Sequence, residues 1–393
     1  MLVKEKIKQA VSLLKETGID CWITFVRESS INGDPVLPFL VNADVTWHSA
    51  FIINSDGTTK AIVGLYDKLS IEDLGVYDEV MGYITGIKEP LLTYLKSVNP
   101  KKIAINFSKE SEICDGLTYG MYLTLHEYLA EIGFQNRLVS SEKIVSALRE
   151  RKSPFEIETM VKAIRQTEEI FDKVAGFIKP GKTEAEIAEF MRNEVKSRKL
   201  GFSWEPSVCP SVFTGPDTAD AHYGPTGRVV ERGHILNMDF GVKTDNYVSD
   251  MQRTFYILRE EEDKAPDDVM HGFNTIVESI EQARQAIKPG VPCFMIDEIC
   301  RNYIVDKGYE EFPHALGHQV GRFAHDGTAI LGPKWEKYAD RPLRLIEKDM
   351  VFTLEPRLTV KNRGVATIEE MVVVTETGAE FLSIPQKEII LIK

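Results

Sequence analysis

Residues 235–257 read ILNMDFGVKTDNYVSDMQRTFYI, and this pattern predicts a β-hairpin with one polar face. In the first strand, ILNMDF, apolar residues alternate with polar ones, so Asp239 lies on the polar face. The segment KTDN predicts a two-residue turn at Thr244 and Asp245, which places Asp239 directly opposite Asp250 with Cβ atoms about 5 Å apart. Because two like charges so placed are unfavourable unless a positive charge lies between them, the hairpin predicts a cation site.

A second hairpin with the same arrangement is predicted over residues 350–375. Its turn centres on Asn362, so Glu355 lies opposite Glu369 and forms a second acidic cross-strand pair. The alternative is that these acids belong to the solvated surface of a protein that has 60 acidic residues.

The chain also contains an internal repeat. The motif IKPG at residues 178–181 recurs at residues 287–290, each copy lies between two helical segments, and a hairpin follows in each half. This shared order indicates a duplication whose halves are related by a pseudo-two-fold axis. Such an axis would bring both acidic pairs together, and four converging carboxylates suit two divalent cations about 3.5–4 Å apart.

The composition favours a globular protein that does not bind nucleic acid. The chain has 393 residues, of which 47 are Lys or Arg and 60 are Asp or Glu, for a net charge of −13. Nucleic-acid binding needs a basic face, which this balance does not favour. Five scattered cysteines without a C-x-x-C motif favour a reducing compartment. Because charges interrupt the N-terminal segment and no apolar run reaches about 18 residues, we expect a cytoplasmic protein without membrane contact.

Two domains are expected. The first part of the chain alternates helices and strands, which predicts a small α/β domain over residues 1–140. Residues 141–393 form the second domain, in which capping boxes begin helices at Ser153 and Thr183. In the first domain, strands are expected at Cys21–Val26, Ser49–Asn54, Lys60–Gly64 and Lys102–Asn106, and helices near 3–17, 88–98 and 117–132.

Histidine is concentrated between the two acidic pairs. His314, His318 and His325 fall within twelve residues there, and His222 precedes the first hairpin. A lone histidine is usually structural. Three together favour a site in which one imidazole completes a metal shell and others act on the substrate.

Five blocks together resemble the pita-bread metallopeptidases, a family that includes methionine aminopeptidase, aminopeptidase P and Xaa-Pro dipeptidase (prolidase). The blocks are ADAHYGPT, MDFGVKTDNYVSDMQRTF, HALGHQVG, FTLEPRL and TIEEMVVVTETG, in the family order over about residues 140–393. The α/β region before them resembles the N-terminal domain of the prolidase, aminopeptidase P and creatinase branch. The resemblance implies an α+β fold, with a small α/β N-terminal domain and a pita-bread (creatinase/aminopeptidase-type) catalytic domain that has a pseudo-two-fold internal duplication.

The resemblance also implies a dinuclear metal centre. The five metal ligands of the family match Asp239, Asp250, His318, Glu355 and Glu369. Asp250 and Glu369 would bridge both ions, Asp239 would hold one of them, and His318 and Glu355 would hold the other. Mn²⁺ is the favoured metal, with Co²⁺, Zn²⁺ and Fe²⁺ as alternatives.

In the mechanism that this resemblance implies, the two cations convert a bridging water to hydroxide near neutral pH, and the hydroxide attacks the scissile carbonyl. His222, His314 and His325 match the substrate and proton-transfer histidines of the family. A metal together with His325 or His222 would stabilise the oxyanion, and Glu355 would carry the proton to the leaving nitrogen. The metal centre would also hold the free α-amine of the substrate.

The sequence departs from the family pattern in the second hairpin. Thr367 stands where Arg is typical, and Arg357 stands where Gly is typical. The predicted register makes them cross-strand neighbours on the face of the glutamates. We hypothesise that Arg357 supplies the guanidinium from the opposite strand and contacts the substrate. The alternative is an ordinary surface arginine.

Other departures lie between the histidines and the second hairpin. Asp326 follows His325 where Glu is usual, Gln319 stands where Gly is usual, and the stretch 327–344 is longer than the usual spacer. This stretch is rich in Lys, Pro and aromatic residues, which predicts a surface loop near the site. It either shapes substrate choice or contacts a dimer partner. These departures bear on proline specificity more than on metal binding.

The function that follows is a dinuclear metal-dependent exopeptidase that hydrolyses Xaa-Pro bonds, either as a dipeptidase or as an aminopeptidase. Its substrate would be a peptide or dipeptide with proline second, and the family implies a homodimer. One alternative is a hydrolase of the same fold that acts on another small amide or peptide, or that cleaves a creatine-like C–N bond without metal. Another is a non-catalytic binding module, which degenerate ligands would mark, but all five ligands are intact.

Overall fold

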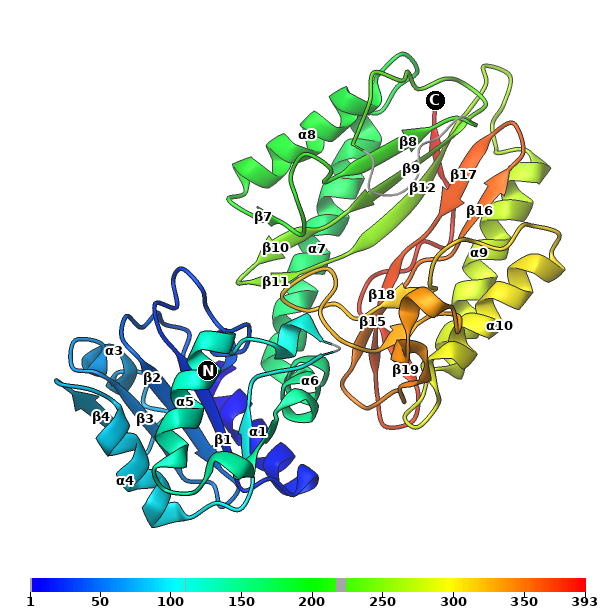
Figure 1. The fold of residues 1–393 in the computed structure, drawn as a ribbon. Coiled ribbons are helices and arrows are strands. Elements are labelled where there is room, and N and C mark those ends of the chain that lie inside the picture. Colours follow the sequence, from blue (N-terminus) through cyan, green and yellow to red (C-terminus); the bar gives the residue numbers. More distant parts are fainter. Residues whose placement is uncertain (1, 110, 217–223) are drawn as a thin grey trace. The chain divides into compact units, whose positions relative to one another are not determined.

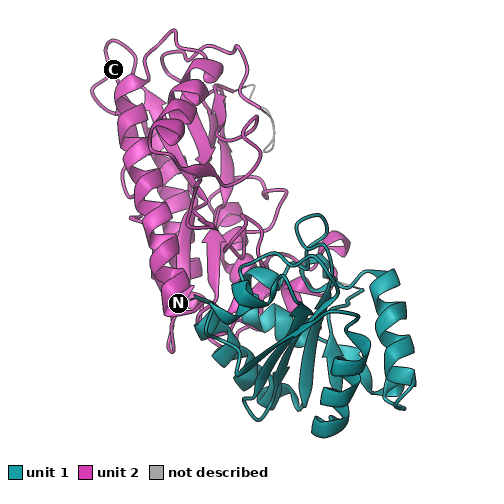
Figure 2. Cartoon of the chain, turned by 90° about the vertical axis from the view of Figure 1, so that its left-hand side faces the viewer, with its two compact units in different colours: residues 1–149 teal, residues 150–393 magenta. Residues whose placement is uncertain are grey.

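The computed structural model describes residues 2–109, 111–216 and 224–393. The chain folds as two compact units, Met1–Arg149 and Glu150–Lys393 (Figure 2). The boundary expected from the sequence, after residue 140, lies shortly before this division. Among the described residues, every helix is too short or too polar to span a bilayer.

The first unit is a mixed six-stranded sheet with helices on both faces (Figure 1). Its strand order is β4-β3-β2-β1-β5-β6. β1 pairs antiparallel with β2, as does β2 with β3, whereas the other three pairs are parallel. The strands are β1 (Cys21–Val26), β2 (Ser49–Asn54), β3 (Thr59–Gly64), β4 (Glu79–Tyr83), β5 (Ile103–Ile105) and β6 (Leu138–Ser140).

Alternate residues of the central strands pack against helices on opposite faces of this sheet. In β1, Trp22 joins a core with α1 and α6, whereas Cys21 and Ile23 join a core with α4 and α5. Because both faces are covered, these strands are continuous apolar runs. The helices are α1 (Leu2–Thr17), α2 (Leu37–Leu40), α3 (Lys68–Glu72), α4 (Lys88–Val98), α5 (Tyr119–Ala130) and α6 (Glu142–Glu150).

All four predicted strands and all three predicted helices of this unit are confirmed, with ends that differ from the expected ones by two residues at most. The sequence did not predict β4 and β6, which are the two edge strands of the sheet. Their residues are exposed or half-buried, so neither strand shows the apolar run by which a buried strand is recognised.

The second unit contains two helix pairs, and a copy of IKPG joins the helices within each pair. Both predicted capping boxes are formed, because Ser153 and Thr183 each exchange hydrogen bonds with the glutamate three residues on. The helices are α7 (Pro154–Phe177), α8 (Glu184–Ser197), α9 (Asp267–Ala286) and α10 (Cys293–Asp306).

The two halves of this unit repeat the same main-chain contacts. The Gly181 amide donates to the Val230 carbonyl at 2.9 Å, and the Gly290 amide donates to the Ile346 carbonyl at 2.8 Å. Both glycines have a positive φ, 91° and 86°, which a residue with a Cβ adopts only with strain. The duplication predicted from the repeated motif is therefore present in the tertiary structure.

Two hairpins lie at the centre of the second unit (Figure 1). The hairpin of β9 and β12 belongs to a sheet of order β20-β12-β9-β8, and β15 and β18 pair in a sheet with β19. The strands β16–β17 and β13–β14 form two short pairs, and β11-β10-β7 form another sheet. The strands are β7 (Gly201–Phe202), β8 (Ser211–Thr214), β9 (Ile235–Phe240), β10 (Val242–Thr244), β11 (Tyr247–Val248), β12 (Met251–Ile257), β13 (Gly317–His318), β14 (Ile330–Leu331), β15 (Val351–Leu354), β16 (Arg357–Val360), β17 (Gly364–Thr367), β18 (Glu370–Val374), β19 (Ala379–Phe381) and β20 (Ile390–Ile392).

The register of the first hairpin differs from the prediction. β9 and β12 pair with Asp239 opposite Gln252, and beside the turn Thr244 pairs with Tyr247. The expectation that Asp239 lies directly opposite Asp250 is therefore wrong. Asp250 instead directly precedes β12, two residues before the partner of Asp239.

The turn residues explain this difference. The two central residues are Asp245 and Asn246, with φ of 48° and 66°, as a type I′ turn requires. Asp and Asn tolerate this left-handed region, whereas the β-branched Thr244 would adopt it only with strain. A turn that moves by one residue changes each cross-strand partner by two positions, so Asp239 and Asp250 still lie on one face.

The register predicted for the second hairpin is confirmed on both sides of its candidate metal-binding glutamates. Arg357 pairs with Thr367 in β16–β17, and Leu354 pairs with Glu370 in β15–β18. The turn residue Asn362 has a φ of 61°. The two glutamates lie between these two ladders, where the Glu355 amide donates to the Leu316 carbonyl and the Glu369 amide donates to the Gln252 carbonyl.

Candidate metal centre

The two hairpins meet at the candidate site. An isolated β-bridge joins Gln252 of β12 to Glu369, whose amide donates to the Gln252 carbonyl at 3.2 Å. Next to it, the Thr254 hydroxyl donates to the carbonyl of Thr367 at 2.5 Å. The acids of both halves therefore converge, as the duplication predicts.

His318, in the two-residue strand β13, approaches three of these acids. Its Nε2 lies 3.3 Å from Glu355 Oε1, 3.8 Å from Asp250 Oδ2 and 4.0 Å from Glu369 Oε1. Asp250, His318 and Glu369 each offer one ligand atom, and these atoms lie within 4.8 Å of one another. One imidazole and two carboxylates so grouped can hold a divalent cation.

Three carboxylate oxygens at this site are buried and accept no hydrogen bond from any residue that the structure describes. They are Oδ1 of Asp239 and both oxygens of Glu369, whose side chain is 1% exposed. A carboxylate buried without a partner is unfavourable because burial removes its water. Divalent cations fit the site, since they would be the missing partners of these oxygens.

The crowding of acids shifts their pKa values. Burial, and then the neighbouring carboxylates, raise the pKa of Asp239 and that of Glu369 well above the usual range. Burial raises the pKa of Asp250 to about 7, although the charge of His318 opposes this shift. Burial opposes protonation of His318, but its hydrogen bond to Glu355 and the nearby carboxylates raise its pKa to about 9. The cluster therefore holds protons that metal binding must displace.

Two more of the predicted histidines lie near Glu355. His314 is half-buried, with Nδ1 2.8 Å from the carbonyl oxygen of Ala315. His325 is exposed, and its ring centroid lies 4.3 Å from that of His318. Burial alone would raise the pKa of Glu355, but the hydrogen bond with His318 and the three imidazoles around it lower that pKa.

Of the two remaining predicted site residues, only Arg357 belongs to the described part of the chain. His222 lies outside the described residues. Arg357 is half-buried and pairs with Thr367, so these two positions are cross-strand neighbours as expected. That the Arg357 guanidinium contacts the substrate stays a prediction.

Gln252 is a site residue that the sequence did not predict. Its Nε2 donates to Glu355 Oε2 at 3.3 Å, and its carbonyl accepts the amide of Glu369. This one residue therefore links the first hairpin to both glutamates of the second. The signal was present in the dipeptide Asp-Asn, because the type I′ turn that it favours places Gln252 opposite Asp239.

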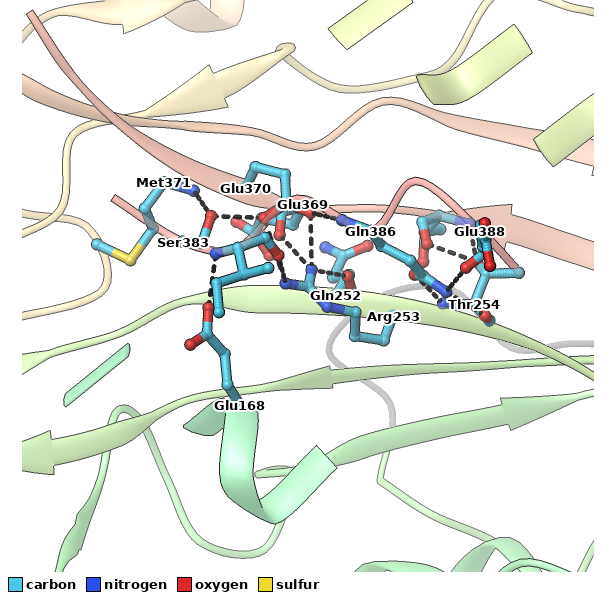
Figure 3. Close-up of polar contacts among 12 residues, drawn as sticks. Glu168, Gln252, Arg253, Thr254, Glu369, Glu370, Met371, Ser383, Gln386 and Glu388 are labelled. Atoms are coloured by element: carbon cyan, nitrogen blue, oxygen red, sulfur yellow. Dashed lines mark hydrogen bonds and ion pairs between the residues drawn. The ribbon is translucent and has the colours of Figure 1, made fainter. Parts of the chain in front are cut away.

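A buried ion pair behind Gln252 also joins the hairpins (Figure 3). Arg253 Nη1 donates to the carbonyls of Gln252 and Glu369, at 2.9 and 3.1 Å. The same nitrogen lies 3.0 Å from Glu370 Oε1, and Glu370 also accepts the amide of Gln386 at 2.8 Å. Because protein groups satisfy this carboxylate, the pair supports the main chain of the site rather than a cation.

Solved structures of Xaa-Pro peptidases share this fold. The X-Pro aminopeptidase from Thermotoga maritima is 24% identical with a TM-score of 0.73, and the match covers 97% of this chain and 100% of that one. The Xaa-Pro dipeptidase from Bacillus anthracis is 24% identical with a TM-score of 0.72, and 99% of each chain is covered. The expected α+β fold is confirmed: a small α/β N-terminal domain is followed by a pita-bread domain with internal pseudo-two-fold duplication.

Sequence comparisons identify the family. An uncharacterized peptidase of Staphylococcus haemolyticus is 30% identical over 295 residues, which cover 75% of this chain and 78% of that protein. One from Staphylococcus aureus is 27% identical over 338 residues, with 85% and 87% covered. The model of metallopeptidase family M24 matches residues 158–376, a range that contains all five candidate metal ligands. The chain therefore belongs to metallopeptidase family M24.

Proposed function

We propose that this metallopeptidase is a dinuclear exopeptidase that hydrolyses Xaa-Pro peptide bonds. The observation that carries the proposal is the cluster of three carboxylates around His318, with Asp239 close to two of them, and with three buried oxygens that no described residue satisfies. Proline specificity is supported by the names of two proteins with this fold, an X-Pro aminopeptidase and an Xaa-Pro dipeptidase.

Asp239, Asp250, His318, Glu355 and Glu369 would hold two divalent cations. When bound, such cations polarise a scissile carbonyl and lower the pKa of water, so that it becomes a nucleophile at neutral pH. Mn²⁺ is the proposed metal, because oxygen ligands outnumber the single imidazole in this set.

The other residues of the site would hold the substrate and transfer a proton. His314 and His325 would donate N–H groups to the substrate carbonyl as negative charge develops on its oxygen, and His222 would assist them. Glu355 would carry the proton to the leaving nitrogen, since the surrounding imidazoles keep its carboxylate ionised. Arg357 would contact the substrate from the strand that follows Glu355.

Peptide hydrolysis by the Mn²⁺-loaded protein tests this proposal. We expect cleavage of Ala-Pro with little cleavage of Ala-Ala, and a peptide such as Ala-Pro-Ala separates a dipeptidase from an aminopeptidase. Cleavage of Ala-Ala without cleavage of Ala-Pro would overturn the proline specificity alone. If protein that holds two Mn²⁺ per chain cleaves no peptide, the exopeptidase proposal is wrong.

We also propose that the protein forms a homodimer. We further propose that it resides in a reducing compartment, the cytoplasm. Tyr66 and Ile84 are 92% and 83% exposed and follow the neighbouring strands β3 and β4, and Leu69 of α3 is 70% exposed. Such apolar exposure suits contact with a second copy. The five cysteines are buried and free, as a reducing compartment allows. Light scattering should give a dimer mass for the native protein and a monomer mass for a Tyr66→Ser/Ile84→Ser variant.

A further inference from the structure

The segment Phe312–Leu316, which carries His314, lies against a buried ion pair of helix α10. Asp297 is fully buried and Arg301 is 6% exposed. The guanidinium meets the carboxylate with two hydrogen bonds, Nε to Oδ2 at 2.7 Å and Nη2 to Oδ1 at 2.8 Å. A bidentate pair of this kind has a defined geometry, which suits it to holding other groups in place.

Apart from one hydrogen bond from Arg301 Nη1 to Glu311 Oε1 at 3.2 Å, the other hydrogen bonds of this pair go to the main chain of the segment. Arg301 Nη1 donates to the Phe312 carbonyl at 2.6 Å, and Nη2 donates to the His314 carbonyl at 2.7 Å. Asp297 Oδ1 accepts the Leu316 amide at 2.9 Å. Three hydrogen bonds from one ion pair therefore fix the backbone on both sides of His314.

The same segment is tied to the metal centre. The Leu316 carbonyl accepts the amide of Glu355 at 2.7 Å. Glu355 in turn contacts His318, which follows Leu316 by two residues. The ion pair of α10 thus fixes His314 relative to the proposed proton-transfer carboxylate.

The stretch 327–344 also contacts this segment, and its Trp335 ring centroid lies 5.1 Å from Cζ of the Arg301 guanidinium. The Ala315 amide donates to the Tyr338 hydroxyl at 3.0 Å, and Lys337 Nζ donates to the Pro313 carbonyl at 3.2 Å. The Tyr338 ring stacks with Trp335, with centroids 5.9 Å apart and an interplanar angle of 13°. This stretch therefore bonds to the main chain beside His314.

We propose that Arg301 and Tyr338 are positioning residues, which hold the main chain of the His314 segment by separate hydrogen bonds so that the imidazole meets the substrate beside Glu355. The proposal rests on the proposed function, in which His314 contacts the substrate. It gives the stretch 327–344 a role in the candidate active site of the same chain, rather than in contact with a dimer partner. Neither residue touches the reacting atoms, and both act through the backbone of residues 312–316.

Tyr338→Phe tests the proposal because it removes one oxygen and retains the ring. In the metal-free protein, we expect the Ala315 amide to exchange with solvent about tenfold faster, as measured by NMR. In the Mn²⁺-loaded protein, we expect kcat to fall about tenfold while KM changes less than about twofold, because a misplaced group affects the reacting geometry more than binding.

Tyr303→Phe is the matched control. Tyr303 lies on α10, and its hydroxyl donates to Glu278 of α9 rather than to the His314 segment. The same atom is lost, so both Ala315 exchange and kcat should stay at their native values. Arg301→Lys is the second test variant, because it retains the positive charge beside Asp297 and loses the planar fork. It should accelerate exchange at Leu316 as well as at Ala315.

Native exchange at Ala315 in Tyr338→Phe would overturn the proposal, and so would faster exchange with an unchanged kcat. Equal effects of Tyr338→Phe and Tyr303→Phe would also overturn it, since they would report general destabilisation. Failure of the proposed function looks different, because the native protein would then cleave no Xaa-Pro peptide. In that case kcat is measured on the peptide that it does cleave, and amide exchange needs no substrate.

Discussion

At the level of one residue, Glu369 illustrates how a buried carboxylate without a partner lowers the stability of the fold. Its carboxylate is buried, neither oxygen accepts a hydrogen bond from the described residues, and burial raises its pKa well above the usual range. Such a group favours the folded state only while it is protonated. Ionisation of this carboxylate is therefore unfavourable for the fold unless cations occupy the site.

Glu369→Gln should separate metal binding from stability. The amide keeps the volume and removes the charge, so we expect loss of metal and of activity. We also expect the metal-free variant to gain about 1–3 kcal/mol in free energy of unfolding. Metal analysis and urea denaturation after chelation measure the two effects. Asp245→Asn, in the exposed turn of the first hairpin, is the control and should change neither. Native metal content in Glu369→Gln would contradict the assignment.

The metal-free protein should become less stable as pH rises from about 6 to about 9. The pKa of Asp250 is raised from 3.8 to about 7, and that of His318 from 6.5 to about 9. Each group contributes stability that is complete below its unfolded-state pKa and is lost as pH rises through its folded-state pKa, so both act in the same direction. Thermal unfolding of the chelated protein across this range measures the effect.

Saturating Mn²⁺ is the control for this pH dependence. Cations replace the protons of the cluster, so the metal-bound protein should not lose stability over the same range. A chelated protein that gains stability toward high pH would show that these acids are not crowded as described.

At the level of elements, the type I′ turn of the first hairpin determines which residues enter the site. Asp245 and Asn246 both have positive φ, and with this turn Asp239 pairs with Gln252. Gln252 then reaches Glu355 with its amide. A turn one residue earlier would place a different residue at that position, because register and turn are coupled.

Substitution of Asn246 should show this dependence. Asn246→Val places a β-branched residue at a φ of 66° and should lower the free energy of unfolding by about 1–2 kcal/mol. Asn246→Gly, which adopts positive φ freely, should stay within about 0.5 kcal/mol of the native protein. Urea denaturation measures both. Equal stability of the two variants would be inconsistent with the observed turn.

At the level of the whole molecule, all five candidate metal ligands belong to the second unit, Glu150–Lys393. The first unit, Met1–Arg149, has its own two hydrophobic cores on the faces of one sheet. Cations that bind only the folded second unit should stabilise that unit by mass action.

Calorimetry with and without chelator should therefore show a selective effect. Mn²⁺ at about 100 times its Kd should stabilise the second unit by about 2.7 kcal/mol and raise its unfolding temperature, while the transition of the first unit stays in place. The Glu369→Gln protein is the control and should show no metal-dependent shift. If Mn²⁺ shifts both transitions equally, the metal does not act through the second unit alone.

Elements whose signals are local could be predicted from the amino-acid sequence alone. The buried strands of the first sheet, the capping boxes at Ser153 and Thr183, and the repeated IKPG motif are confirmed. They were predictable because apolar runs, caps and turn glycines depend on residues close in the chain. The duplication predicted the convergence of the acids, and the family blocks predicted the fold. The edge strands β4 and β6 could not be predicted in this way, because their residues are exposed or half-buried and form no apolar run.

The groups that surround the acids could not be predicted in this way, because packing brings them there. Gln252 contacts Glu355 because the turn of the first hairpin sets its register. Arg301, which belongs to the ion pair on helix α10, donates a hydrogen bond to the His314 carbonyl. Neither contact leaves a periodic pattern in the sequence, because each joins segments brought together by packing. The pKa values of the acids likewise follow from burial and mutual distance, which exist only in the folded chain. The sequence predicted the acids and histidines of the candidate site, whereas packing determines which other groups contact them and how they are charged, held and aligned.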